Sequence, residues 1–398
     1  MKPSRSRRET RAAILNYIWC NGGAYRPNLA ADLALTDASI SRIVAELKSE
    51  DVIAESRHTA PYQGGPSAFF TLSKNKHIGA IEVSNNSIHV GVAAVTGEPI
   101  FIERLTLVDG ADPLVVDDAM SKAVGALASG CTRYDAQLEQ IAVALPGYRS
   151  SHVTNPIIPL NTGNLRKRLE HEFRGVAVEI ANSIVARAIA HRTRMRVGHL
   201  GSPSFYVFAG HGVAAAVVDE FAESGEVTAC EIGHMVFDPK GPKCRCGNFG
   251  CVETYLSTAA IARCLKVEEV AILDLGDKWP ERIPIASKAE TELGERLIRL
   301  GLTIGNALNI VQTRRVLLGG WPVGLGNKSI AAIRKGINAS LFGGADEVEL
   351  HLVASELGRE PSSALALATF AYLRRGGMSL QVAMAKNAAA GNVAGAQY

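Results

Sequence analysis

The sequence has no apolar run long enough to cross a membrane. Its longest candidate, Ala364 to Leu373, covers ten residues, whereas a membrane-spanning helix needs roughly 20. Basic residues stand at the N-terminus without the apolar stretch that follows them in a secretory signal peptide. We therefore expect a cytoplasmic protein that does not contact a membrane.

The net charge is also small, and the cysteines do not suggest a set of disulfide pairs. A net charge of +3 is too small to indicate nucleic-acid binding by itself. The seven cysteines are an odd number, and four are scattered, which favours a reducing compartment over a disulfide framework. Only Met1 to Arg11 concentrates positive charge, with five basic residues and one acid. Such a tail can lie on phosphates, although a solvated, disordered end has the same composition.

The chain is too long for a single ordinary core. Its 398 residues predict two or three domains. Hydrophobic residues make up 47% and charged residues 20%, a normal balance for a soluble globular protein. Near residue 76 the pattern changes from helices to short strands and glycine turns that alternate with helices. We expect a domain boundary at this point.

The first 50 residues predict three short helices. Ile14, Leu15 and Ile18 are apolar at helical spacing, and Asn21-Gly22-Gly23 ends this run. A second helix follows Pro27. A third begins at Thr36 or Asp37, either of which can cap it. The apolar stripe that the third helix is expected to bury consists of Ile40, Ile43, Val44 and Leu47.

The opposite face of the third helix is small and polar, with one arginine, which suits a helix that lies in a major groove. Two short strands around Gln63 to Pro66 predict a β-wing. Helices and wing in this order resemble a winged helix-turn-helix. The residues that we expect at DNA are Thr36, Ala38, Ser39, Ser41, Arg42, Arg57, Gly64 and Gly65.

A three-helix cap without a role at DNA has the same pattern and remains an alternative. Glu46, Glu50, Asp51 and Glu55 also place negative charge on or after the third helix, and this charge repels phosphates. We therefore expect that DNA binding requires two copies of the domain.

A compact group of thiols and one imidazole stands in the middle of the chain. Cys244, Cys246 and Cys251 lie within eight residues, and His234 precedes the first of them by ten. Three cysteines and one histidine are the ligands of a closed tetrahedral zinc site. Gly247 and Gly250 allow the tight turn between the second and third thiols. Ordinary buried cysteines in a glycine-rich loop are the alternative.

The large domain has two halves with similar patterns. A predicted hairpin over residues 78–95 in the first half is repeated by another over residues 205–218 in the second. Buried strands follow both hairpins, among them Ile141 to Leu145 and Arg315 to Leu318. Two hairpin-bearing α/β halves predict a duplicated fold with a cleft between them.

With these motifs the chain resembles the ROK family, which contains repressors and sugar kinases on one fold. The winged helix, the run Glu231-Ile-Gly-His234, the pattern Cys-x-Cys-Gly-x-x-Gly-Cys-x-Glu from Cys244 to Glu253 and the late Gly319-Gly320 turn carry the resemblance. It implies an α/β fold in which a winged helix-turn-helix precedes a two-lobed hexokinase/actin-like (ribonuclease H-like) domain.

The resemblance also implies roles for single residues. Structural zinc would be held by His234, Cys244, Cys246 and Cys251. Glu231, His234 and Glu253 would lie against the hydroxyls of a sugar, since carboxylates accept hydrogen bonds from hydroxyls. Both glutamates could instead support the zinc site. We expect a DNA-binding domain over residues 1–73, a sugar-sensing domain over residues 76–387 and a disordered tail over residues 388–398.

The general base of the ROK kinases is missing. In the family this base is the aspartate of an Asn-Asp run, and it takes the proton of the attacking sugar hydroxyl. Here Ile180 and Ala181 stand in the matching places, and no acid occurs from Ile180 through His191. Asn182 is close by, but an amide cannot act as a base.

Both phosphate loops of the kinases are altered as well. The early loop, normally Asp-x-Gly-Gly-Thr, reads Glu82-Val-Ser-Asn-Asn86, without the glycines that let backbone N–H groups approach a phosphate. The later loop, normally Gly-Thr-Gly-x-Gly, reads Gly210-His-Gly-Val-Ala214. With three kinase elements damaged, the sequence predicts no sugar kinase activity.

The sequence therefore predicts a transcriptional regulator, most simply a repressor of genes for carbohydrate uptake or catabolism. Its partners would be double-stranded operator DNA and a sugar or sugar-derivative effector. It would act as a homodimer or a dimer of dimers. Two alternatives remain: an active ROK sugar kinase that uses ATP with a displaced base, and an interaction protein that does not bind DNA.

Overall fold

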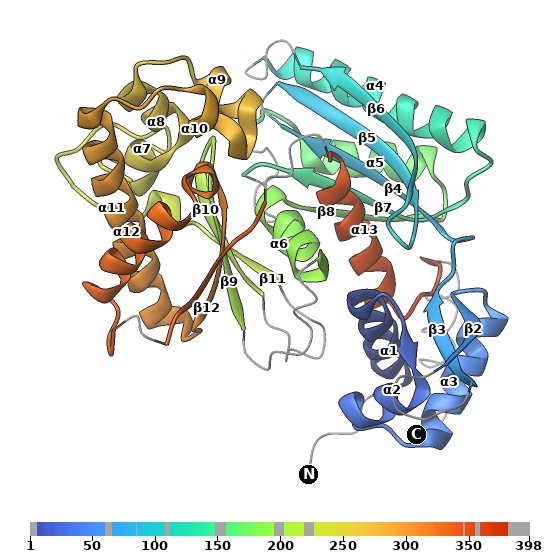
Figure 1. Ribbon diagram of the computed structural model, residues 1–398. Helices are drawn as coiled ribbons and strands as arrows, with labels where there is room; N and C mark the ends of the chain where they lie inside the picture. Colours follow the sequence, from blue (N-terminus) through green and yellow to red (C-terminus); the bar gives the residue numbers. More distant parts are fainter. Residues whose placement is uncertain are drawn as a thin grey trace, which may run out of the picture. The chain divides into compact units, whose positions relative to one another are not determined.

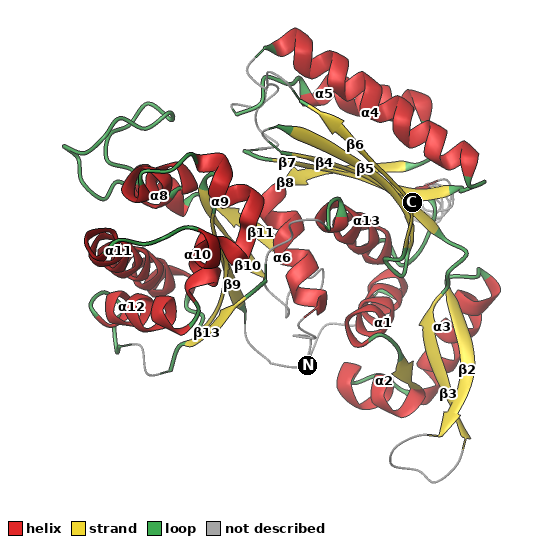
Figure 2. Cartoon of the chain, turned by 45° about the horizontal axis from the view of Figure 1, so that its top comes forward, coloured by secondary structure: helices red, strands yellow, loops and turns green. Residues whose placement is uncertain are grey.

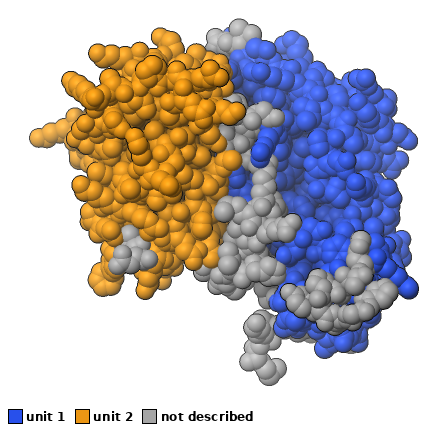
Figure 3. Space-filling view, in the orientation of Figure 1, with its two compact units in different colours: residues 1–200, 359–398 blue, residues 201–358 orange. Residues whose placement is uncertain are grey.

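The computed structural model describes residues 6–59, 66–84, 86–107, 112–147, 157–194, 203–218, 227–344, 347–354 and 359–380. The chain forms two compact units (Figure 3). The first comprises Met1–Leu200 and Arg359–Tyr398, and the second comprises Gly201–Gly358. No helix in the described ranges combines the length and the apolar composition of a membrane span.

The first unit begins with the three expected helices and a small sheet (Figure 1). Ser6 and Glu9 form a capping box at the start of the first helix, Gly22 ends it in a left-handed conformation, and Thr36 caps the third helix. The sheet has the order β1-β3-β2. The elements are α1 (Arg7–Asn21), β1 (Ala24–Tyr25), α2 (Arg26–Leu33), α3 (Asp37–Ser49), β2 (Ile53–Thr59) and β3 (Pro66–Leu72).

A five-stranded sheet follows in the same unit, in the order β6-β5-β4-β7-β8. β4, β5 and β6 are antiparallel, whereas β4, β7 and β8 run parallel. Helices α4 and α5 cover one face, and α6 and α13 lie on the other (Figure 2). The elements are β4 (His77–Val83), β5 (Ser87–Ala94), β6 (Pro99–Thr106), α4 (Pro113–Arg133), β7 (Leu138–Leu145), α5 (Thr162–Glu172), β8 (Ala177–Asn182), α6 (Ser183–Arg194) and α13 (Ser362–Arg374).

The second unit contains a sheet of the same design, in the order β11-β10-β9-β12-β13. Its strands are β9 (Ser204–Ala209), β10 (Val213–Val218), β11 (Val227–Cys230), β12 (Arg315–Gly320) and β13 (Glu349–Leu352). Its helices are η2 (Ile232–His234), α7 (Val252–Leu256), α8 (Thr258–Leu265), α9 (Glu269–Leu275), η3 (Gly276–Lys278), α10 (Trp279–Arg282), α11 (Ser287–Val311), η4 (Trp321–Leu325) and α12 (Asn327–Asn338).

The apolar residues of these strands and helices form the core of the second unit. Trp279, Leu300 and Ile304 are fully buried in this core. Helix α11 packs closely on α12 because Gly301 has no side chain. A Cβ there would stand 2.1 Å from the carbonyl oxygen of Ile333, which is far inside a van der Waals contact. Glycine at position 301 is therefore required for the packing of α11 on α12.

The two large sheets share one strand order, in which the third, second, first, fourth and fifth strands of each half are neighbours. The duplicated α/β fold predicted from the sequence is thus confirmed, together with the N-terminal helices. The division at residues 73 and 76 stays a prediction. The predicted tail over residues 388–398 lies outside the described residues.

Candidate functional site

One row of side chains on α3 is exposed and faces away from the buried stripe. Ala38, Arg42 and Ala45 are exposed, and Ser41 beside them is half-buried. Spacings of three and four residues place them on one helix face, opposite Ile40, which is 0% exposed. This row is small enough for a backbone to approach closely, and it carries a single cation.

Thr36, one of the two predicted caps of α3, bonds to Ser39 in the first turn of the helix. The Thr36 hydroxyl accepts a hydrogen bond from the backbone N–H of Ser39 at 3.3 Å, and the two side-chain oxygens lie 3.0 Å apart. Thr36 is exposed and Ser39 is half-buried. On the wing, Arg57 is exposed on β2, whereas Gly64 and Gly65 lie outside the described residues.

Glu46 and Glu50 of the third-helix region are paired with cations from the N-terminal segment, which corrects the expectation about that segment. Arg7 and Arg11 do not belong to a free tail but lie in α1. Arg7 pairs with Glu46 at 2.6 Å, and the buried guanidinium of Arg11 pairs with Glu50. Burial raises the pKa of Glu46, but the hydrogen bond and charge of Arg7, with the charges of Arg11 and Arg42, outweigh burial and lower it.

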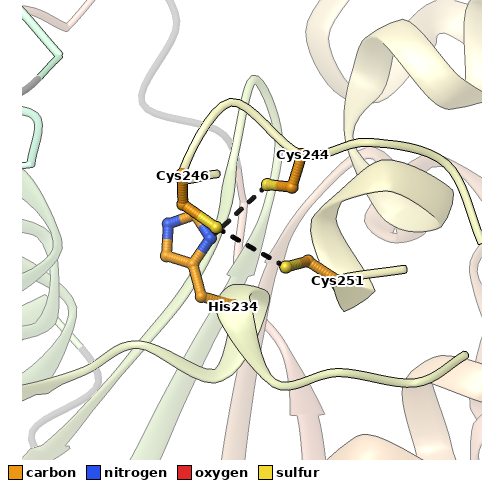
Figure 4. Close-up of side chains that lie close together, drawn as sticks. All are labelled: His234, Cys244, Cys246 and Cys251. Atoms are coloured by element: carbon orange, nitrogen blue, oxygen red, sulfur yellow. Dashed lines mark hydrogen bonds between the residues drawn. The ribbon is translucent and has the colours of Figure 1, made fainter. Parts of the chain in front are cut away.

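The predicted metal ligands meet in the second unit (Figure 4). Sγ of Cys246 lies 3.6 Å from Sγ of Cys251, and Sγ of Cys244 lies 3.8 Å from Nδ1 of His234. All four donor atoms lie within 4.8 Å of one another. The sequence prediction that these four residues converge is correct.

The loop that carries the thiols, which we call the knuckle (residues 234–251), is held by backbone bonds and one obligatory glycine. Val236 pairs with Cys251, and Lys243 pairs with Phe249, as short antiparallel bridges. Gly250 has a φ of 63°, and a Cβ there would stand 1.5 Å from the carbonyl oxygen of Asp238. Only glycine permits this turn.

The four donors fit a zinc ion. Thiolates at about 2.3 Å from the metal, on the corners of a tetrahedron, are about 3.8 Å apart, and the sulfur–sulfur and sulfur–nitrogen distances given above are close to this value. Burial and hydrogen bonds from the neighbouring thiols raise the pKa of Cys251 to about 12. An ionised thiolate at this buried position therefore needs a cation beside it.

Glu253, the predicted sugar contact, joins the knuckle to the loop between β9 and β10. Its Oε2 accepts a hydrogen bond from the backbone N–H of Val213 at 3.0 Å, and its Oε1 lies 3.3 Å from Nε of Arg245. A Cβ on Gly212 would stand 2.6 Å from Oε2. Glu253 as a whole residue is 9% exposed, so its carboxylate is well placed to support this loop.

Glu231, the other predicted carboxylate, precedes η2 and is half-buried. Its backbone oxygen accepts a hydrogen bond from the N–H of His234 at 3.0 Å. The short helix η2 thus holds Glu231 and His234 in one turn, next to the knuckle. The sequence model of the ROK family matches residues 79–370 of this chain.

The chain belongs to the ROK family.

ROK relatives match the chain over almost its whole length. It is 24% identical to the DNA-binding transcriptional dual regulator NagC of Escherichia coli over 382 residues, which cover 92% of each protein. It is 23% identical to the xylose repressor of Caldicellulosiruptor bescii over 355 residues, which cover 83% of this chain and 87% of that protein.

Solved ROK structures share the fold. A ROK family transcriptional regulator, described as a homologue of the E. coli MLC protein, superposes with a TM-score of 0.71 and 20% identity over 95% of this chain and 98% of that one. A ROK glucokinase from Streptomyces griseus, in complex with glucose and AMPPNP, gives a TM-score of 0.55 and 20% identity over 73% and 98%. The predicted family and fold class are confirmed.

The ROK kinase elements that the sequence found altered have other structural uses here. Ile180 is 5% exposed at the end of β8, and the side-chain oxygen of Asn182 accepts the backbone N–H of Ile184 at 3.1 Å, where α6 begins. In the later loop, Nδ1 of His211 lies 3.1 Å from Oε1 of Glu269. None of these contacts positions a base for a sugar hydroxyl.

Two arginines that contact the knuckle or Glu253 were missed by sequence reasoning. Arg245 lies within the knuckle and pairs with Glu253. The guanidinium of Arg299 in α11 contacts two aromatic rings, 5.0 Å from the centroid of Phe237 and 5.1 Å from that of Tyr255. The only sequence signal for Arg245 is its place between two predicted ligands, and Arg299 gives none, because its partners are distant in the sequence.

Proposed function

We propose that this chain is a DNA-binding transcriptional regulator, most simply a repressor, that acts in the cytoplasm on genes for carbohydrate uptake or catabolism. The exposed row on α3 carries the proposal, since it is small and cationic, and the acids Glu46, Glu50 and Glu55 are each paired with a cation. The names of two relatives, a DNA-binding transcriptional dual regulator and a xylose repressor, support it.

The DNA-contacting residues that we propose are Thr36, Ala38, Ser39, Ser41, Arg42 and Arg57, with Gly64 and Gly65 in the wing. Recognition helices of this kind read base edges with a few exposed side chains. Two helices in a homodimer, or in a dimer of dimers, would bind two half-sites, because operator symmetry mirrors protein symmetry.

We further propose that the ROK domain senses a sugar or sugar derivative without phosphorylating it. Burial of Ile180 and the use of the Asn182 side-chain oxygen at the start of α6 leave the matching segment without a general base. A coupled phosphorylation assay with a panel of hexoses and ATP should show no turnover above roughly one per second, a typical enzyme rate. A higher rate would overturn this part of the proposal.

In this proposal zinc is structural and His234 has two functions. Its Nδ1 faces the thiols and would bind the metal with Cys244, Cys246 and Cys251. Its other nitrogen, Nε2, would then carry the proton and donate a hydrogen bond to the effector. Glu231 and Glu253 would accept hydrogen bonds from the hydroxyls of the effector.

Selection of bound oligonucleotides from a random pool, with and without a panel of sugars, tests the regulator directly. We expect a palindromic site whose retention by the protein at moderate salt depends on its sequence, and one class of sugar that changes this retention. Equal binding to the selected site and to a shuffled site would refute DNA-specific regulation. Unchanged binding with every sugar would refute the sensor.

A further inference from the structure

Arg26 is the first residue of α2, and its side chain reaches α3. One guanidinium nitrogen, Nη1, donates a hydrogen bond to the hydroxyl oxygen of Ser41 at 2.9 Å. The same hydroxyl donates to the backbone oxygen of Asp37 at 2.7 Å. Ser41 lies beside the exposed residues of α3, so Arg26 adds a second cation, besides Arg42, at the edge of that row.

The backbone at Arg26 is held by neighbouring strands. Tyr25 pairs with Phe69 in the ladder between β1 and β3, and their rings lie 4.8 Å apart. A Cβ on Gly23 would stand 2.1 Å from the ring of Phe69, so the chain packs tightly on the wing strand before α2 begins. Arg26 therefore lies at a rigid junction of wing, second helix and third helix.

The cations of this region fall into two groups. Arg7, Arg11 and Lys48 each have a carboxylate within 4.0 Å. In the part of the region that the structure describes, Arg26 has no such ion pair, and it is half-buried rather than buried. Its neutral partner, Ser41, orients the guanidinium without cancelling its charge.

We propose that Arg26 binds a phosphate of the DNA backbone and so positions the recognition helix α3. This inference rests on the proposed DNA-binding function. A guanidinium has five N–H donors in a planar fork that matches a phosphate, and the bond to Ser41 uses one of them. Phosphate contacts set the register of a protein on the duplex, while base contacts read the sequence.

The salt dependence of DNA binding tests this assignment. Each phosphate contact contributes about 0.9 to the slope of log affinity against log salt, so Arg26→Met should lower the slope by about one per protomer. Its affinity for the selected operator and for shuffled DNA should fall by the same factor. Arg26→Lys should keep the slope, because the charge stays, and Ser41→Ala should keep the slope with weaker binding.

Arg133→Met is the matched control. Arg133 is exposed at the end of α4 and stacks on the ring of Tyr134, so its removal changes the net charge by the same amount without touching the winged helix. We expect it to bind DNA like the wild type. Thermal unfolding of every variant shows whether the fold is preserved.

The outcomes separate this inference from the function on which it rests. A wild-type protein that binds operator and shuffled DNA alike overturns both. Sequence-dependent binding by the wild type, with an Arg26→Met slope equal to that of the wild type, overturns only the phosphate assignment. A loss confined to the operator would make Arg26 a base-reading residue and would also overturn it.

Discussion

The two large sheets of this protein have the same strand order, but the hairpin at the start of each makes different contacts. In the first unit, the hairpin of β4 and β5 carries Glu82, which is 4% exposed. Its Oε2 accepts the backbone N–H of Ala364 at 3.3 Å, where α13 begins. In the second unit, the loop between β9 and β10 keeps Gly210 and Gly212 and is held by Glu253.

The difference shows that the same hairpin position serves two structural uses in a duplicated fold. In the first unit the carboxylate of Glu82 supports the start of α13. The second unit retains the knuckle, the two glutamates and a loop with room only for glycine beside Glu253. The first hairpin is therefore tied to helix packing, and the second is tied to the residue that follows the knuckle.

The largest expected effect comes from the knuckle. Structural zinc contributes roughly 10–16 kcal/mol of binding in small zinc domains, so Cys251→Ser should remove several kcal/mol from the unfolding free energy and abolish zinc retention. Thermal unfolding and metal analysis measure both. Cys264→Ser, outside the cluster in α8, is the control. A chelator that left the wild type unchanged would contradict the metal assignment.

The next effect tests the first hairpin. Glu82→Ala leaves the N–H of Ala364 without its carboxylate partner in a buried place, which costs about 1–3 kcal/mol. Glu82→Gln keeps an oxygen acceptor and should lose less. Urea unfolding compares the two. Equal stability of Glu82→Ala and the wild type would show that this acid has no structural function.

Gly212→Ala tests the second hairpin. The new methyl group would stand 2.6 Å from Oε2 of Glu253 and would displace the carboxylate, at a cost of about 1 kcal/mol, the low end for overpacking. The free energy of effector binding should fall by more than the free energy of unfolding. Gly294→Ala in α11 meets nothing within 4 Å and should be neutral or stabilising. Titration calorimetry measures the binding, and thermal unfolding measures the stability. Effector binding by Gly212→Ala equal to that of the wild type would contradict the prediction.

The smallest effect concerns how the ion pair of Glu292 and Arg296 on α11 changes the stability of the protein in acid. The hydrogen bond from Arg296 lowers the pKa of Glu292, so its stabilisation is present above the unfolded pKa near 4.5 and disappears as pH falls through the folded value. Because the side chain is 42% exposed, we expect less than about 1 kcal/mol. Glu292→Gln should flatten the stability curve between about pH 5 and 3.

Glu295→Gln is the matched control for this measurement, since Glu295 lies on the same helix and has no ion pair within the described ranges. Both variants remove one carboxylate from α11, but only Glu292 has a guanidinium partner. If both changed the acid limb of the stability curve equally, the Arg296 contact would contribute nothing.

Local signals made much of the fold predictable. The cap at Thr36, the stripe from Ile40 to Leu47 and the hairpins over residues 78–95 and 205–218 depend on neighbours in the sequence, and each is present. The spacing of Cys244, Cys246 and Cys251 placed the knuckle in the same way. The expectation of a free basic tail failed for Arg7 and Arg11 because their partners lie 39 residues away.

By itself, then, the sequence determined the family, the duplicated sheets, the four candidate metal ligands and the altered kinase residues, because short-range spacing and residue type define each of them. The tertiary structure alone decided which charges are available. Arg11 became a buried partner of Glu50, Glu82 a support of α13, and Arg26 a cation held by a hydroxyl. The physical reason is that a charge is neutralised by whatever the fold brings within a few ångströms, and that distance is unrelated to distance along the chain.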